Sequence, residues 1–68
     1  MDRPGGAEVV ALRKTLRLTQ EAFARELEVT VSTVNRWENG HSRPSRLASR
    51  RLADIAHTLA AAARPLTA

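Results

Sequence analysis

The chain has 68 residues, which leaves room for one small domain and excludes a two-domain enzyme. It contains no cysteine, so disulfides and thiolate metal sites are excluded, and a reducing cytoplasm is the expected setting. Eleven basic residues against seven acidic ones give a formal net charge of +4, which favours a polyanionic partner.

The N-terminal segment is rich in residues that disfavour helix, so residues 1–6 are expected to form a flexible N-terminus. From residue 7 onward, apolar side chains recur at helical spacing with basic side chains between them. This pattern predicts an amphipathic helix that ends near residue 16 or 17, with Val9, Leu12 and Leu16 on its inner face.

A second helix is predicted over residues 20–27. Thr19 is a good N-cap, and Ala22, Phe23 and Leu27 form one apolar stripe among residues that favour helix. After a short turn, Thr30 can cap a third helix.

The third segment, residues 31–39, has two interpretations. Its β-branched residues suggest a strand, but the apolar residues do not alternate strictly and no second strand is available for pairing. We therefore predict a helix with Val34 and Trp37 in the core and Val31 exposed, ended by Asn39 and Gly40.

A fourth helix follows a loop and is predicted to begin after Ser45 as N-cap and to end before Pro65. Its core stripe is formed by Ala48, Leu52, Ile55 and Leu59. The folded domain is thus expected over residues 7–64, with residues 65–68 as a tail. The longest apolar run, residues 59–63, is too short to span a bilayer, so no membrane partner is expected.

Three stretches of the sequence carry a resemblance to a known family: LTQEAFAREL at residues 18–27, VTVSTVNRWENG at 29–40 and RPS at 43–45. They closely resemble the phage-repressor and Cro-like helix-turn-helix family, also called the xenobiotic-response-element type, over about residues 9–59. The resemblance implies an all-α, compact domain of four helices, or five if the last is divided. No Gly or Pro interrupts residues 46–64, so the last two helices of the family are expected to be fused here.

The sequence departs from the family at Glu28, a turn position that relatives usually give to glycine. A left-handed backbone there costs a non-glycine residue roughly 1 kcal/mol. The resemblance also implies an ion pair between Arg13 and Glu38, whereas two independently solvated side chains are the simpler alternative.

The resemblance further implies which residues contact DNA. Gln20 is expected to bind a phosphate, residues of the third helix to face the major groove, and the following loop to approach the sugar-phosphate backbone. The alternative for these side chains is plain solvation, and for His41 an exposed loop histidine is an equally good interpretation. The expected DNA-binding residues are Gln20, Val31, Ser32, Thr33, Asn35, Arg36, Asn39, His41, Arg43 and Arg46.

The function that follows is sequence-specific binding of double-stranded DNA by a transcriptional regulator, most simply a repressor, with residues 31–39 in the major groove. A homodimer is expected on DNA. The protein is expected to be bacterial or phage-encoded, cytoplasmic and associated with the nucleoid. The alternatives are an antitoxin or protein-interaction module that uses the C-terminal helix, and a sequence-neutral architectural DNA binder. Two histidines without organised partners offer neither a catalytic nor a metal site, so no enzyme, cofactor, metal or small-molecule ligand is expected.

Overall fold

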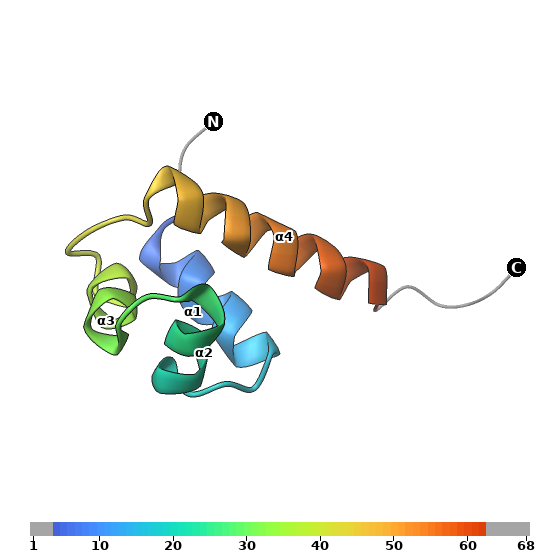
Figure 1. Ribbon diagram of the computed structural model, residues 1–68, viewed down its shortest axis with the longest axis horizontal. Helices are drawn as coiled ribbons and strands as arrows, with labels where there is room; N and C mark the ends of the chain where they lie inside the picture. Colours follow the sequence, from blue (N-terminus) through green and yellow to red (C-terminus); the bar gives the residue numbers. More distant parts are fainter. Residues whose placement is uncertain (1–3, 63–68) are drawn as a thin grey trace, which may run out of the picture.

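The computed structural model describes the backbone of residues 4–62 and the side chains of residues 4–60. All regular structure in that range is helical: α1 (Gly6–Thr15), α2 (Gln20–Leu27), α3 (Val31–Glu38) and α4 (Arg46–Ala62) (Figure 1). The all-α prediction is confirmed, and α4 runs without a break to Ala62. The predicted helix end at residue 64, the tail at 65–68 and residues 1–3 lie outside the described residues.

The predicted N-caps Thr19, Thr30 and Ser45 all precede helices. Each side-chain oxygen accepts a hydrogen bond from the backbone N–H three residues later, at 3.1, 3.1 and 3.2 Å respectively. Such a bond satisfies one of the amide donors that the first helical turn leaves without a partner. The starts of α2, α3 and α4 are therefore encoded locally in the sequence.

Left-handed residues end two of these helices. Gly40 follows α3 with a φ of 77°, as the predicted glycine stop requires. Glu28 follows α2 with φ 58° and ψ 41°, so the expected left-handed backbone is present at this non-glycine position. Arg17, in the turn between α1 and α2, also has a φ of 58°, which the sequence did not indicate.

Helix α1 begins at Gly6, a residue that the sequence places in a flexible N-terminus. A Cβ atom at Gly6 would lie 2.6 Å from the carbonyl oxygen of Trp37 and 2.9 Å from that of Glu38. The absence of a side chain thus lets the start of α1 approach the backbone at the end of α3. Gly6 is part of the packed fold for this reason.

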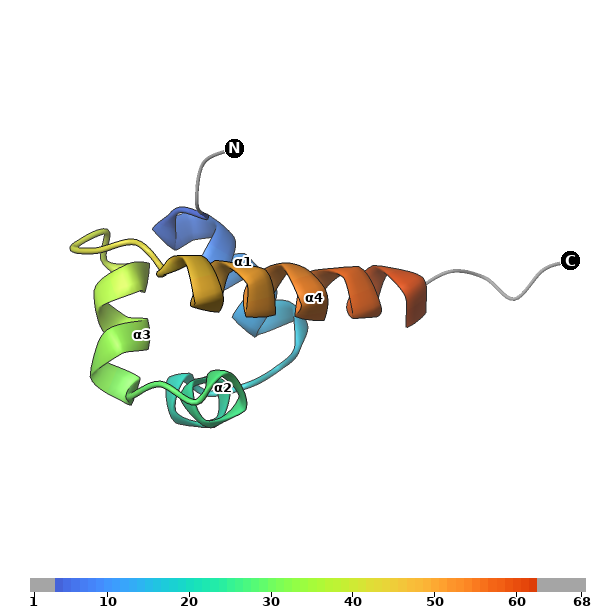
Figure 2. The same ribbon diagram turned by 45° about the horizontal axis from the view of Figure 1, so that its top comes forward.

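The core is assembled from all four helices, and its largest fully buried side chains include Phe23, which is 0% exposed. Most of the predicted apolar stripes are confirmed, but Leu59 is only half-buried and does not join the core. Leu59 instead lines an open depression together with Leu16 and Ile55. Figures 1 and 2 show that the later turns of α4 extend beyond the unit formed by α1, α2 and α3. The buried core residues are Val9, Phe23, Ala24, Leu27, Val34, Trp37, Ala48 and Leu52.

Helices α2 and α3 are joined by residues 28–30 and lie at a steep angle to each other (Figure 2). Ala24, on α2, is 3% exposed, and its small side chain sits in the core that both helices share. Two short helices crossed over a three-residue turn form a helix-turn-helix, with α3 at one end of the molecule.

Candidate nucleic-acid interface

Helix α3 has one buried face and one exposed face. Val34 and Trp37 are 0% and 4% exposed, whereas Val31 is 40% exposed. The residues at positions i, i+1, i+4 and i+5 of the helix share the exposed face, as 3.6 residues per turn requires. That face carries Val31, Ser32, Asn35 and Arg36, all exposed.

Thr33, another expected DNA-binding residue, lies at the edge of this face and is half-buried. Its hydroxyl is 2.9 Å from that of Thr30, and its backbone N–H donates to the same Thr30 oxygen. Thr33 therefore takes part in the cap of α3, which fixes the angle at which the helix begins.

An ion pair joins α1 to the end of α3 behind the exposed face. The Arg13 Nε donates to Glu38 Oε2 at 2.6 Å, and Nη2 donates to Oε1 at 3.1 Å. The third guanidinium nitrogen, Nη1, donates to the Leu18 carbonyl oxygen at 3.0 Å. The ion pair expected from the family is present, and Arg13 also holds the turn before α2 in place.

The two side chains of this pair are 17% and 8% exposed, so little water screens them. Burial by itself raises the pKa of the Glu38 carboxyl, but hydrogen bonds from Arg13 and Gln20 and the Arg13 charge lower it below its usual value. The hydrogen bond to Glu38 raises the pKa of Arg13 above its usual value. The pair is therefore held in its charged form.

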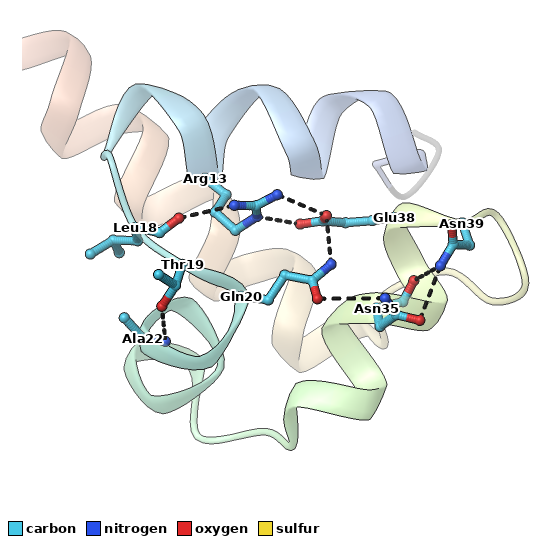
Figure 3. A network of polar contacts seen from close by, with 8 residues as sticks. All are labelled: Arg13, Leu18, Thr19, Gln20, Ala22, Asn35, Glu38 and Asn39. Atoms are coloured by element: carbon cyan, nitrogen blue, oxygen red, sulfur yellow. Dashed lines mark hydrogen bonds and ion pairs between the residues drawn. The ribbon is translucent and has the colours of Figure 1, made fainter.

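A chain of amide side chains leads from this ion pair to the exposed face (Figure 3). Gln20 Nε2 donates to Glu38 Oε1 at 2.9 Å, and Gln20 Oε1 accepts from Asn35 Nδ2 at 3.5 Å. Asn39 Nδ2 then donates to Asn35 Oδ1 at 3.0 Å and to the Asn35 carbonyl oxygen at 2.9 Å. Three of the expected DNA-binding residues are thus brought together.

The remaining expected residues follow α3 along the chain. His41 and Arg43 are exposed in the loop, and Arg46 is exposed at the first position of α4. Arg46 and Arg50 also line an open depression between α1 and α4, beside Glu8. Arg51 lies 3.7 Å from Glu28, so this arginine is paired with an acid outside its own helix.

The sequence did not reveal the bonds of Gln20 to Glu38 and to Asn35. These residues are 18 and 15 positions from Gln20, and nothing in their spacing predicts contact. The hydrogen bond between Asn35 and Asn39 could have been predicted from their spacing, because residues four apart are neighbours on a helix.

No group of three or more His, Asp or Glu side chains in residues 4–60 could hold a metal ion. In the part of the chain that the structure describes, no helix is long and apolar enough to cross a membrane.

A family model described as helix-turn-helix matches residues 9–57, which include α2, α3, most of α1 and more than half of α4. No curated protein and no solved structure matches the chain.

Proposed function

Because the chain belongs to the Cro/C1-type helix-turn-helix family, a family of DNA-binding regulators, we propose that it represses transcription by binding a specific duplex sequence. In this proposal α3 enters the major groove, where each base pair presents a distinct set of donors, acceptors and methyl groups. Occupancy of the site then excludes the polymerase. Such a protein would act on the nucleoid of a bacterial cell.

The observation that carries the proposal is the exposed face of α3. The apolar residues of α3, Val34 and Trp37, are buried in the core, so the opposite face of the helix is accessible to another molecule. That face offers a methyl-bearing side chain, Val31, and a guanidinium, Arg36, on a helix short enough to fit the groove. Valine methyls suit the thymine methyl, and arginine suits the two acceptors of guanine.

Contacts to phosphates are assigned to both sides of α3. Gln20 opens α2, where a polar side chain and the amide donors of a helix start can bind the same anion. On the other side, His41, Arg43 and Arg46 follow α3. The segment of residues 36–51 is basic, because its one acid, Glu38, is neutralised by Arg13. Its five arginines are Arg36, Arg43, Arg46, Arg50 and Arg51. Phosphate contacts of this kind position the protein, and the base contacts specify the site.

We further propose that two copies bind one site. The single exposed face of an eight-residue helix reads only a few base pairs, and a second copy related by twofold symmetry doubles the length read. The half-sites should lie about one helical turn, roughly 34 Å, apart.

Selection from a pool of random duplexes tests this function. Wild-type protein should enrich one sequence with two related half-sites, and footprinting should protect both halves. The control is a shuffled duplex of the same composition, which should bind far more weakly at the same salt concentration. Binding of selected and shuffled duplexes with equal affinity would instead identify an architectural binder, and no binding even at low salt would favour a protein-interaction module.

A further inference from the structure

The amide side chains of Gln20, Asn35 and Asn39 form a hydrogen-bonded chain that begins at Glu38 (Figure 3). We propose that the Glu38 carboxylate sets the orientation of the Gln20 amide and, through it, of the Asn35 amide, and so decides where these two side chains present donors and acceptors to DNA. This inference rests on the proposed function. It gives Glu38 a positioning role in addition to its ion pair.

The first step follows from the chemistry of a carboxylate. An ionised Glu38 can only accept hydrogen bonds, and its Oε1 atom lies 2.9 Å from the Gln20 amide nitrogen. A reversed amide would place the Gln20 oxygen against the Glu38 oxygen, where two acceptors repel each other. Because the Glu38 side chain is only 8% exposed, water has little room to relieve that contact. The Gln20 oxygen must therefore face away from Glu38.

The second step transmits this orientation along α3. The Gln20 oxygen faces Asn35, so Asn35 must present its Nδ2 group to it, at 3.5 Å. The Asn35 Oδ1 atom then lies on the other side of the amide and accepts from Asn39. The Asn39 nitrogen also donates to the Asn35 carbonyl oxygen, so both of its hydrogens are in use.

The result is a defined set of groups for a ligand. One side-chain N–H of Gln20 and one of Asn35 remain available, whereas the Asn39 amide offers only its Oδ1 oxygen. Phosphate oxygens accept hydrogen bonds, so Gln20 and Asn35 can bind phosphates or base acceptors. Asn39 in this orientation requires a donor instead, such as the amino group of cytosine or adenine.

Substitution Glu38→Gln should release this orientation. A glutamine at position 38 can turn its own N–H toward the Gln20 oxygen, and the turned Gln20 then faces Asn35 with its amide nitrogen. Asn35 can accept from it only by turning its oxygen away from Asn39, whose amide stays held by the Asn35 carbonyl oxygen. The donor and acceptor positions of Gln20 and Asn35 are then exchanged. Arg13→Lys is the matched control, since it weakens the same ion pair but keeps the carboxylate as an acceptor. The fluorescence of the single, buried Trp37 reports whether each variant is folded.

A test without DNA uses the side-chain amide signals in NMR spectra. Glu38→Gln should shift the signals of Gln20, Asn35 and Asn39, whereas Arg13→Lys should leave those of Asn35 and Asn39 in place. If Glu38→Gln moves the Gln20 signal alone, the proposed transmission is wrong. If this variant fails to fold, Gln20→Ala takes its place. It removes the side chain that links Glu38 to Asn35 and should shift the Asn35 signal, and an unmoved Asn35 signal would overturn the inference.

A test with DNA compares base preferences at every position of the duplex selected by the wild type. Glu38→Gln should change the preference by about tenfold for at least one base pair, the value of one lost or gained specific contact, and Arg13→Lys should not. Equal weakening on all duplexes would overturn the positioning role. Wild-type protein without any base preference would instead overturn the proposed function, while the NMR result would still decide the orientation of the amides.

Discussion

Replacement of either member of the Arg13–Glu38 pair by methionine should destabilise the fold severely. Arg13→Met leaves the Glu38 carboxylate, whose side chain is 8% exposed in the structure, with Gln20 as its remaining hydrogen-bond partner among the described residues, and Glu38→Met leaves the guanidinium without its bidentate acceptor. A buried charge that loses its partner costs about 3 kcal/mol. A chain of 68 residues has a total stability of only about 3–10 kcal/mol, so each single substitution should bring the domain close to unfolding.

The double substitution should cost clearly less than the sum of the two single ones, because it leaves no unpaired charge. We expect a coupling free energy of about 2 kcal/mol, within the range of residues that share a hydrogen-bond network. Urea unfolding followed by Trp37 fluorescence measures all four proteins, with a stabilising osmolyte present in each so that the single variants stay folded. Additive losses would refute a direct coupling and would reduce the pair to two independent side chains.

Three further predictions concern stability. Gly6→Ala should lower the free energy of unfolding by about 1–3 kcal/mol, because the added Cβ would lie 2.6 Å from the Trp37 carbonyl oxygen. Gly5→Ala is the control and should have no such effect, since nothing lies within 4 Å of a Cβ there, and thermal unfolding compares the two variants. Glu28→Gly should raise the melting temperature by a few degrees, since a left-handed backbone costs a non-glycine residue about 1 kcal/mol, and an unchanged or lower value would show that no strain is relieved. The lowered pKa of Glu38 stabilises the fold above its unfolded value of about 4.3, and this contribution should be lost as the pH falls through the lower folded value; Glu38→Gln should flatten that part of a pH titration of stability.

The fold could be predicted from the sequence because its signals are local. The capping residues Thr19, Thr30 and Ser45 and the glycine stop at Gly40 act within one helical turn, and the structure has them all in these roles. The extent of burial along α4 was less predictable. Leu59 has the helical spacing of a core residue, but burial depends on how completely the surrounding side chains cover it, and Leu59 lines an open depression together with Leu16 and Ile55.

The sequence indicated which residues of α3 face outward, but it did not indicate the hydrogen bonds between helices. Periodicity places Val34 and Trp37 inward, which leaves Arg36 and Asn35 outward, and this is how α3 is arranged. The hydrogen bond from Gln20 to Glu38 joins two helices and depends on their relative position in space. The close approach at Gly6 also depends on the position of another helix. A glycine can stand at the start of a helix for many reasons, and only the nearby backbone of α3 shows why it is needed here.

The most direct test of α3 as the reading element compares Arg36→Ala with Arg43→Ala on the selected duplex and on shuffled DNA. Arg36 lies on the exposed face of α3, and Arg43 is exposed in the loop that follows it. Arg36→Ala should lose about 1–3 kcal/mol on the selected duplex and much less on shuffled DNA, so that selectivity falls. Arg43→Ala should weaken both duplexes alike and reduce the salt dependence of binding by the equivalent of about one phosphate contact. Equal weakening of both duplexes by Arg36→Ala would contradict the account and would make Arg36 another phosphate contact.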